Sequence, residues 1–290
     1  MKIAITGSTG YLGSNLVREI SNLKDFEVIG LSRKNNHIQP LNKHIFFDLK
    51  EEKITLPDDI DWLIHCAADL SDNPISSSQE INSSKNLLKL CKSKNIKFIF
   101  ISSCMADKNS ENRYGRVKYL IEQEVIKMNG LIIRPGWIFG GLQIGQYGSY
   151  LSLIKKLKIL PIFFPPILLQ PTYVKDIFKV IQKLFSHKKF KNNIFCVGHT
   201  SKVSFHVFIK NIIKYKTDKK KYFIIIPNFL FSGLLYLLSL LSVFFVSKYN
   251  SFKNFRKSPY MKTYETEKEL GIKFLSIEEA YKFEEKSEPN

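Results

Sequence analysis

The stretch that most constrains the fold of this chain is residues 6–13, whose sequence is TGSTGYLG. It follows a short apolar run at residues 2–5, which predicts a buried parallel strand, and it leads into residues 14–20, whose apolar side chains recur at helical spacing. A glycine-rich turn between a strand and a helix lets the backbone approach a pyrophosphate, and the positive end of the helix dipole attracts its charge. The sequence therefore predicts a strand, a turn and a helix that bind a dinucleotide.

The glycines of this turn follow the spacing Gly-x2-Gly-x2-Gly. This spacing resembles that of the short-chain dehydrogenase/reductase superfamily, in particular its extended branch of nucleotide-sugar epimerases, dehydratases and reductases. The resemblance implies an α/β fold of the Rossmann type, with a doubly wound parallel sheet and a smaller C-terminal lobe that binds the substrate. It also implies that the turn contacts a nicotinamide dinucleotide through Gly7, Thr9, Gly10, Tyr11, Leu12 and Gly13.

The length of 290 residues and an apolar content of 44% allow one large α/β domain with a smaller lobe attached. We expect residues 1–165 to form the dinucleotide-binding core, completed by a strand near residues 193–198. Residues 166–290 are expected to form mainly the substrate lobe. Residues 141–169, which are rich in Leu, Ile, Phe and Pro, are expected to be a loop that covers the substrate.

The four cysteines bear on metal binding and on the cellular compartment. Cys66, Cys91, Cys104 and Cys196 lie far apart in the sequence and form no CxxC pair, so we expect neither a metal site nor a disulfide framework. The first apolar run leads directly into the cofactor turn, so no signal peptide is predicted. A cytoplasmic location is therefore expected.

The formal net charge of +18 is unevenly distributed, with +3 over residues 1–150 and +15 over residues 151–290. The second half is therefore expected to face an anion, such as a nucleotide diphosphate or an acidic membrane surface. A lysine-rich codon bias would produce the same composition. The chain contains no nucleic-acid-binding motif, so nucleic acid is not an expected partner.

Two strand ends supply candidate contacts to the adenosine half of the cofactor. Residues 26–31 predict a second strand, and Arg33 follows it where a dinucleotide fold meets the adenosine ribose. A basic side chain there suits the 2′-phosphate of NADP, whereas an acidic one would bind the 2′-hydroxyl of NAD. Arg33 therefore favours NADP over NAD, with a solvated loop charge as the alternative. Residues 45–47 predict a third strand, and the resemblance places Asp48 and Leu49 after it, near the adenine amino group.

A fourth strand is predicted at residues 61–65, and it runs into the small residues Cys66, Ala67 and Ala68. Small side chains would let the phosphate and ribose of the cofactor lie against the backbone. The run resembles the H-x-A-A signature of the family. In that signature the histidine belongs to the strand, so we expect His65 to be a packed structural residue.

The pattern most specific for catalysis combines Ser103 with Tyr114 and Lys118 in the motif Tyr-x3-Lys. Residues 97–101 predict a fifth strand that ends just before the serine. On a helix the tyrosine and lysine lie one turn apart on the same face, so the ammonium lowers the phenol pKa toward the range of a general acid/base. The resemblance makes Tyr114 the acid/base and lets Ser103 hydrogen-bond the reacting oxygen. It also counts Tyr114 and Lys118 among the cofactor contacts.

The resemblance assigns supporting roles to four further residues. Asn82 is expected to open a helix over residues 83–93 and to brace the active-site region. Pro135 and Gly136 belong to a segment similar to the R-P-x3-[YF]-G motif of the family and are expected to line the nicotinamide side. Asp176 is expected to be a helix N-terminal charge or brace rather than a catalyst.

The sequence thus predicts an enzyme that uses NADP or NAD to transfer hydride at a sugar carbon of a nucleotide-sugar, as a 4-epimerase or a 4-keto reductase. Dehydration usually needs acidic groups beside the catalytic serine, and Cys104 and Met105 stand there instead, which disfavours a dehydratase. The stretch between the serine and the tyrosine is shorter than in well-known extended epimerases, so the sugar and the nucleotide stay open. The competing hypothesis is a non-catalytic dinucleotide-binding accessory protein, against which the complete Ser/Tyr/Lys set argues.

Residues 222–247 contain no charged side chain and are expected to be helical, with 18 residues at 229–246 long enough for a bilayer span. Three interpretations compete: a span, a hairpin or helix in one leaflet, and a helix buried in the core or in a homodimer. Basic flanks on both sides disfavour a span and favour peripheral contact with the cytoplasmic face of a membrane. On a helix, one stripe would contain the polar residues Asn228, Ser232, Ser239 and Ser242. The rest of the helix surface would be a broad apolar face.

Overall fold

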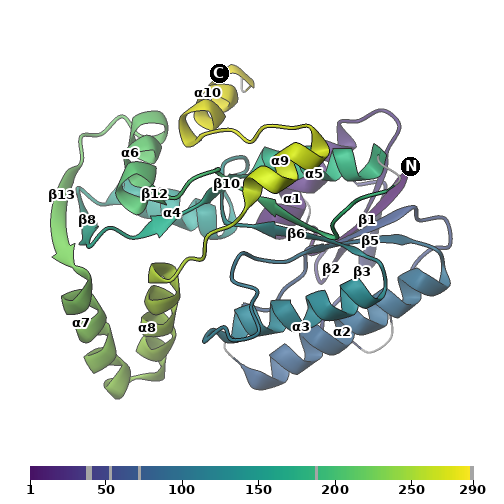
Figure 1. The fold of residues 1–290 in the computed structure, drawn as a ribbon, viewed down its shortest axis with the longest axis horizontal. Coiled ribbons are helices and arrows are strands. Elements are labelled where there is room, and N and C mark those ends of the chain that lie inside the picture. The colour runs from purple at the N-terminus through teal and green to yellow at the C-terminus, as the bar shows by residue number, and fades with distance from the viewer. Residues whose placement is uncertain (37–40, 52–53, 71–72, 187–188, 288–290) are drawn as a thin grey trace.

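The computed structural model describes residues 1–36, 41–51, 54–70, 73–186 and 189–287. At its centre is a seven-stranded sheet in the order β11-β6-β5-β4-β1-β2-β3, in which every neighbouring pair is parallel (Figure 1). This arrangement confirms the predicted Rossmann-type fold. The strands are β1 (Lys2–Thr6), β2 (Glu27–Ser32), β3 (Lys43–Phe46), β4 (Trp62–His65), β5 (Lys97–Ile101), β6 (Leu131–Pro135) and β11 (Ile194–Val197).

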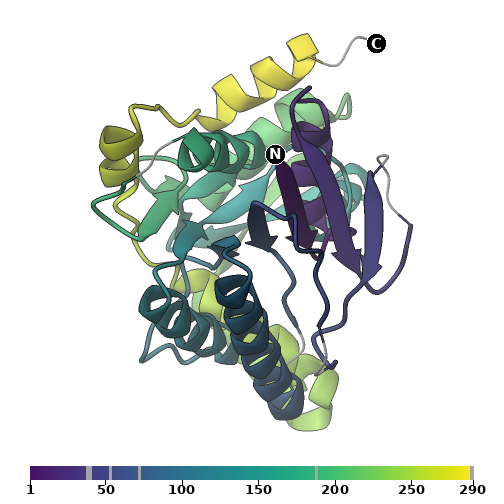
Figure 2. The same cartoon turned by 90° about the vertical axis from the view of Figure 1, so that its right-hand side faces the viewer.

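Both faces of the sheet are buried, which is why its inner strands are continuous apolar runs. Along β1, Ile3 and Ile5 pack against one helical layer and Ala4 packs against the other. Figure 2 shows the two layers on opposite sides of the sheet. The first layer contains α1 (Tyr11–Ser21), α5 (Val174–Ser186) and α9 (Thr263–Leu270), and the second contains α2 (Pro74–Ser93) and α3 (Arg113–Lys127).

The second lobe has its own aromatic core, next to the carboxyl ends of the strands. This lobe contains three two-stranded sheets. They pair β7 (Trp137–Phe139) with β10 (Pro171–Tyr173), β9 (Leu168–Leu169) with β12 (Val203–Ser204), and β8 (Ile159–Phe164) with β13 (Tyr222–Pro227). Its helices are α4 (Gly145–Lys156), α6 (Phe205–Lys216), α7 (Asn228–Leu241), α8 (Val243–Arg256) and α10 (Ile277–Ser287). The core includes Phe139, Tyr147, Leu151, Ile154, Phe208 and Tyr281.

The predicted loop over residues 141–169 is wrong, because this stretch contains α4 and β8. Tyr147, Leu151 and Ile154 recur at helical spacing and are buried in the second lobe. Trp137 anchors that lobe, since its ring packs against four aromatic rings at centroid distances of 4.9–5.8 Å. The chain also crosses between the lobes repeatedly: α5, β11 and α9 follow residue 165 in sequence and pack in the sheet layer.

The apolar segment 222–247, predicted to be helical, is a strand followed by a helical hairpin. Its first six residues form β13, which pairs with β8 along its whole length, as the three consecutive isoleucines at 224–226 favour. Pro227 then leads into α7, and Ser242 is the residue between α7 and α8. The hairpin projects from the second lobe (Figure 1). Within the described ranges, no helix combines the length and the hydropathy that a membrane crossing requires.

Candidate active site

The glycine turn holds the start of α1 close to the end of β1. Gly7 has a φ of +64°, which favours glycine. A Cβ atom on Gly13 would lie 2.2 Å from the carbonyl oxygen of Gly7, so a larger residue would push the helix away from the turn. Gly10 is the N-cap residue of α1 and has no side chain that could accept hydrogen bonds from the first backbone N–H groups of the helix. The first turn of α1 also contains no acidic residue. The end of this helix therefore suits an external anion such as the pyrophosphate of a dinucleotide.

We expect Gly13→Ala to weaken the binding of NADH or NADPH by at least about tenfold, roughly 1.4 kcal/mol, because the clash is with backbone atoms that the turn needs in place. Titration of the nicotinamide fluorescence measures this affinity. Gly233→Ala is the matched control, since a Cβ atom on that helical glycine meets nothing within 4 Å. Equal affinities of Gly13→Ala and the wild type would contradict the placement of the pyrophosphate.

A buried chain of hydrogen bonds ties the turn to the end of β4. The hydroxyl of Thr6 accepts hydrogen bonds from the backbone N–H groups of Cys66 and Ala67, at 3.1 Å each, and contacts Nδ1 of His65 at 2.7 Å. Nε2 of His65 lies 3.0 Å from the hydroxyl of Ser84, which donates to the carbonyl oxygen of Glu80. Burial, together with the charge of Lys118, lowers the pKa of His65 to about 3. His65 is therefore a neutral structural residue, as predicted.

The three candidate catalytic residues come together after β5 and at the start of α3. Asn112 caps α3 by accepting a hydrogen bond from the backbone N–H of Tyr114 at 2.9 Å. Lys118 lies one turn further on, with Nζ 5.5 Å from the centroid of the Tyr114 ring. The hydroxyl of Ser103 lies close enough to the phenol of Tyr114 to lower the pKa of that tyrosine. The geometry thus joins the hydroxyl, the phenol and the ammonium that the sequence pattern selects.

Lys118 forms a buried ion pair with Glu80 that sequence reasoning missed. Nζ lies 3.2 Å from Oε1 of Glu80, both side chains are 1% exposed, and Oε2 accepts a hydrogen bond from the backbone N–H of Asp69 at 2.9 Å. The expectation for Asn82 is wrong, because α2 begins at Pro74 and Asn82 is exposed in its middle. Helical spacing could have predicted that Glu80 is buried. It lies on the same side of α2 as the buried residues Ser83, Ser84, Leu87, Leu88 and Cys91.

The pKa of Tyr114 is raised rather than lowered. Burial is the largest cause, and the charge of Lys118 acts against it, as the sequence predicted. The negative charge of Glu80 raises the phenol pKa further, while the hydroxyl of Ser103 lowers it. For Lys118, burial is the largest single cause and lowers the pKa, but the charge and hydrogen bond of Glu80 together with the charges of Tyr114 and Cys66 outweigh it and leave the pKa above its ordinary value. Glu80 therefore partly cancels the effect of the lysine on the phenol.

The turn after β6 packs beside the residue that follows the candidate catalytic serine. The backbone N–H of Cys104 donates to the carbonyl oxygen of Pro135 at 2.9 Å. The N–H of Gly136 donates to the hydroxyl of Thr172 at 2.8 Å, and a Cβ atom on Gly136 would lie 2.0 Å from the carbonyl oxygen of Gln170. This close approach requires glycine, and it fixes the segment that the sequence assigns to the nicotinamide side.

Two buried carboxylates brace the elements around the site. Glu122 on α3 is fully buried and pairs with Arg134, whose Nε donates to Oε1 at 2.7 Å, and it also accepts a hydrogen bond from Ser102. Sequence reasoning missed Glu122. Asp176 accepts a hydrogen bond from the backbone N–H of Leu275 at 3.0 Å and is buried in the first turn of α5. This position agrees with the bracing role expected for Asp176.

The remaining predicted cofactor contacts follow neighbouring strands at the carboxyl edge of the sheet. Arg33 is exposed after β2, and Asp48 and Leu49 follow β3. Cys66, Ala67 and Ala68 follow β4, and a Cβ atom on Gly7 would lie 2.9 Å from the backbone nitrogen of Ala67. The strand order reverses between β1 and β4. In open α/β sheets, ligands bind in the crevice at such a point, so these residues stay predicted cofactor contacts.

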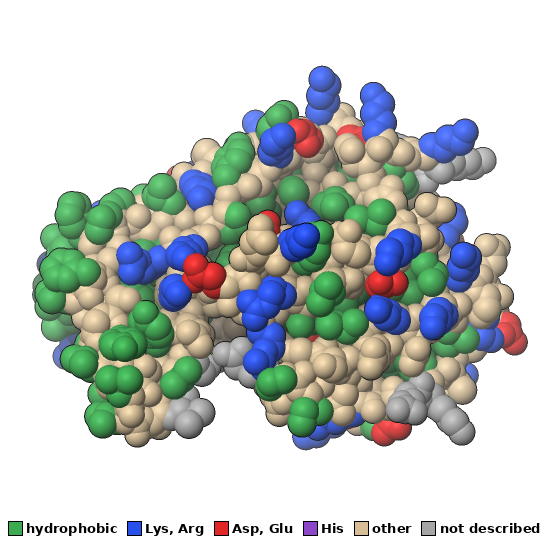
Figure 3. Space-filling view, turned by 60° about the horizontal axis from the view of Figure 1, so that its bottom comes forward, with side chains coloured by type: hydrophobic (Ala, Val, Ile, Leu, Met, Phe, Trp, Pro, Cys, Tyr) green, Lys and Arg blue, Asp and Glu red, His purple; other side chains and the backbone are tan. Residues whose placement is uncertain are grey.

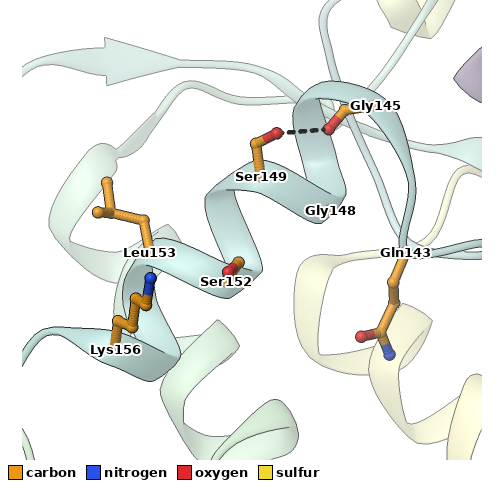
Figure 4. A pocket seen from close by; sticks show the side chains of 7 residues that line it. All are labelled: Gln143, Gly145, Gly148, Ser149, Ser152, Leu153 and Lys156. Atoms are coloured by element: carbon orange, nitrogen blue, oxygen red, sulfur yellow. Dashed lines mark hydrogen bonds between the residues drawn. The ribbon is translucent and has the colours of Figure 1, made fainter.

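A groove of about 510 Å³ runs along α4 (Figure 4), and its lining includes none of the candidate catalytic residues. Ser149 in its wall donates a hydrogen bond to the carbonyl oxygen of Gly145, and Lys156 is the titratable residue in its lining. The groove therefore offers little for acid/base chemistry. Its lining consists of Gln143, Gly145, Gly148, Ser149, Ser152, Leu153 and Lys156.

Neither a metal centre nor a reactive thiol is found near the site. Among the residues that the structure describes, no three His, Cys, Asp or Glu side chains are placed to hold a metal ion. Cys104 follows the catalytic serine, and burial raises its pKa to about 11. Its thiol is therefore protonated near neutral pH and is a poor nucleophile.

Comparison with known proteins identifies the first part of the chain. The model of the NAD dependent epimerase/dehydratase family matches residues 3–131, which hold the glycine turn, Ser103, Tyr114 and Lys118. This part of the chain is therefore similar to that family over residues 3–131. The resemblance inferred from the glycine spacing and the Tyr-x3-Lys motif is thereby confirmed. The family depends on NAD, and its match ends before the second lobe begins.

A curated relative and solved structures extend the likeness beyond the family match. The chain is 26% identical over 243 residues to a UDP-glucose 4-epimerase of Vibrio cholerae, covering 70% of this chain and 72% of that protein. The ADP-L-glycero-D-manno-heptose-6-epimerase of Helicobacter pylori superposes with a TM-score of 0.71 at 20% identity, covering 97% and 94% of the two chains. The Bordetella bronchiseptica enzyme WbmG, solved with NAD and UDP, gives a TM-score of 0.66 at 13% identity, covering 97% and 92%. The two structural matches show that the second lobe also follows this fold.

Proposed function

We propose that this chain is an NAD(P)-dependent oxidoreductase or epimerase of a nucleotide-sugar, of the 4-epimerase or 4-keto reductase type. The observation that carries the proposal is the convergence of Ser103, Tyr114 and Lys118 at the same edge of the sheet as the uncapped, glycine-rich start of α1. The UDP-glucose 4-epimerase relative supports a nucleotide-sugar substrate. Cys104 and Met105, in place of acidic groups after the serine, argue against a dehydratase.

A bound nicotinamide would accept or supply the hydride. In the oxidative direction, Tyr114 as phenolate takes the proton of the sugar hydroxyl, while Ser103 hydrogen-bonds the same oxygen as it becomes a carbonyl. The ammonium of Lys118 stabilises the phenolate, and Glu80 fixes the position of that ammonium. In the reductive direction the tyrosine returns its proton to the oxygen, so one set of residues serves an epimerase or a reductase.

A panel of UDP-, dTDP-, ADP- and GDP-linked sugars tests this proposal. A reductase changes the nicotinamide absorbance with a 4-keto sugar, whereas an epimerase converts one sugar to its epimer without a net change in absorbance. Chromatography of the products separates the two outcomes. The alternative is a non-catalytic accessory protein, which predicts tight binding of the cofactor and no conversion of any sugar.

For the cofactor, we propose a preference for NADPH over NADH that rests on Arg33. We expect Arg33→Ala to weaken NADPH binding by roughly tenfold, because a charge-assisted contact to the 2′-phosphate contributes about 1.5 kcal/mol or more, and to leave NADH binding nearly unchanged. Lys24→Ala, an exposed charge before β2, is the control. Unchanged NADPH affinity in Arg33→Ala would count against the preference and favour NAD.

We further propose that the enzyme acts in the cytoplasm, at the membrane face, without a nucleic-acid partner. A cytoplasmic site is where nucleotide-sugars would be available together with nicotinamide cofactors. A homodimer is the competing assembly. The apolar hairpin would contact the membrane in the first case and a second copy of the chain in the other.

A further inference from the structure

The second lobe carries an exposed apolar face, which we define as the outer surface of β8, β13 and α7. Ile159 and Phe164 on β8 and Tyr222, Ile224 and Ile225 on β13 are 53–69% exposed. In Figure 3 hydrophobic side chains gather over the lobe that carries these elements. Contiguous apolar surface of this kind marks an interaction site in soluble proteins. On α7 the exposed residues are Phe229, Leu230, Leu234, Leu237, Leu240 and Leu241, at 54–82%.

The orientation of α7 is the reverse of that expected for a helix on a water-exposed surface. Its polar residues turn toward the protein: Asn228 is buried and donates to the carbonyl oxygen of Pro165, and Ser232 and Ser239 are only partly exposed. Apart from Gly233 and Tyr236, the exposed positions of α7 are Phe and Leu residues. Phe231 packs against Phe163 and Phe252 at centroid distances of 5.3 and 4.8 Å, which holds α7 in this orientation. The outward apolar side is therefore a fixed feature of the lobe.

The charge around this face is mostly positive, with the exposed Asp218 as an exception. Residues 141–262 contain 21 of the 44 Lys and Arg but only 2 of the 26 Asp and Glu. The net charge of this stretch is therefore +19, compared with +18 for the whole chain. Exposed lysines cluster at one end of the face, at the start of β13, where Lys221 donates to the carbonyl oxygens of Lys155 and Leu157. The exposed members of the cluster are Lys155, Lys156, Lys158, Lys219 and Lys220.

We propose that this face docks on a bilayer surface that contains anionic phospholipid. Apolar side chains of α7 and β13 enter the boundary between headgroups and acyl chains, and the lysine cluster contacts the headgroups, as in monotopic amphipathic elements. A second copy of the chain fits less well, because a symmetric dimer through this face would bring two strongly positive lobes together. The proposal does not depend on the catalytic assignment.

Docking would place the active site near the membrane. Glu111 precedes the cap residue of α3 and pairs with Lys253 of α8 and with Lys257, which follows that helix, at 2.7 Å each. These ion pairs join the hairpin to the loop between Ser103 and Tyr114. A membrane-bound hairpin is thus linked to the loop that precedes α3, and Lys253 and Lys257 already have a protein partner.

Vesicle flotation of the full chain tests the proposal. We expect binding to vesicles of phosphatidylcholine mixed with phosphatidylglycerol and little binding to phosphatidylcholine alone. Salt at about 0.5 M should weaken binding without releasing all of the protein, because it screens the lysines and leaves the apolar contact. The combined variant Leu234→Gln, Leu237→Gln and Leu241→Gln should lose binding by more than roughly tenfold, given the apolar area removed. Lys219→Gln with Lys220→Gln should lose roughly fivefold per lysine.

The control is Ile75→Gln with Leu120→Gln, which removes two exposed apolar side chains from the sheet lobe and should bind vesicles like the wild type. Circular dichroism and the thermal midpoint verify that each variant is folded. Equal binding to neutral and anionic vesicles would overturn the role of the lysines. If the wild-type protein binds no vesicle, the proposal is overturned. This holds whether the face is then free in a monomer, buried in a dimer that the leucine variant dissociates, or covered by an acidic protein.

Discussion

Replacing Tyr114 by Phe is expected to lower turnover by roughly 10²- to 10⁴-fold, the usual range for loss of a general acid/base. The variant removes the phenolic oxygen, which moves the proton, and keeps the ring that lies beside Lys118. Binding of the nicotinamide cofactor should stay within about twofold of the wild type, since the glycine turn is untouched. The measurement is the conversion of any nucleotide-sugar that the panel shows to be accepted, at saturating cofactor.

Tyr119→Phe is the matched control for this prediction. Tyr119 lies on the same helix, half-buried, and the change removes the same hydroxyl group at a position outside the catalytic set. It should retain wild-type turnover. Near-wild-type turnover of Tyr114→Phe with every accepted substrate would mean that another group moves the proton.

Glu80→Gln is expected to destabilise the fold by about 3–5 kcal/mol, because it leaves the buried ammonium of Lys118 without a counter-charge. The amide keeps the shape of the side chain and an oxygen that can accept the hydrogen bond from Asp69. Urea unfolding measures the change. The double variant Glu80→Gln with Lys118→Met should recover part of the loss, because it removes the uncompensated charge. A double variant no more stable than the single one would contradict the ion-pair explanation.

The same variant should change the pH dependence of catalysis. In the wild type, burial and Glu80 raise the pKa of Tyr114, whereas Lys118 lowers it. Without the charge of Glu80, the pKa of the phenol falls, so the rise of the oxidation rate with pH should move to lower pH. Glu278→Gln, which breaks an exposed ion pair with Lys214, is the control and should leave both stability and the pH profile little changed. A purely structural role for Glu80 would lower activity without moving the profile.

Local sequence determined the sheet and the candidate site. The inner strands β1, β4 and β5 are largely continuous apolar runs because both faces of the sheet are buried there, and such runs can be recognised without knowing their neighbours. Gly13 and Gly136 are required by backbone contacts within their own turns or with nearby strands. The Tyr-x3-Lys spacing fixes Tyr114 and Lys118 on one helical face wherever the helix lies. These features depend on short-range geometry, which the sequence contains directly.

Only the tertiary structure decided the charge balance of the site and the shape of the second lobe. Glu80 lies 38 residues from Lys118 in the sequence, and their pairing depends on how α2 and α3 pack, so the direction of the Tyr114 pKa could not be read from the motif. The apolar run at 222–247 fits a strand or a helix equally well by composition. Pairing with β8 made its first six residues a strand, and contacts of Phe231 with Phe163 and Phe252 turned the leucines of α7 outward. Such long-range contacts override local propensity, because packing contributes more free energy than intrinsic preference does.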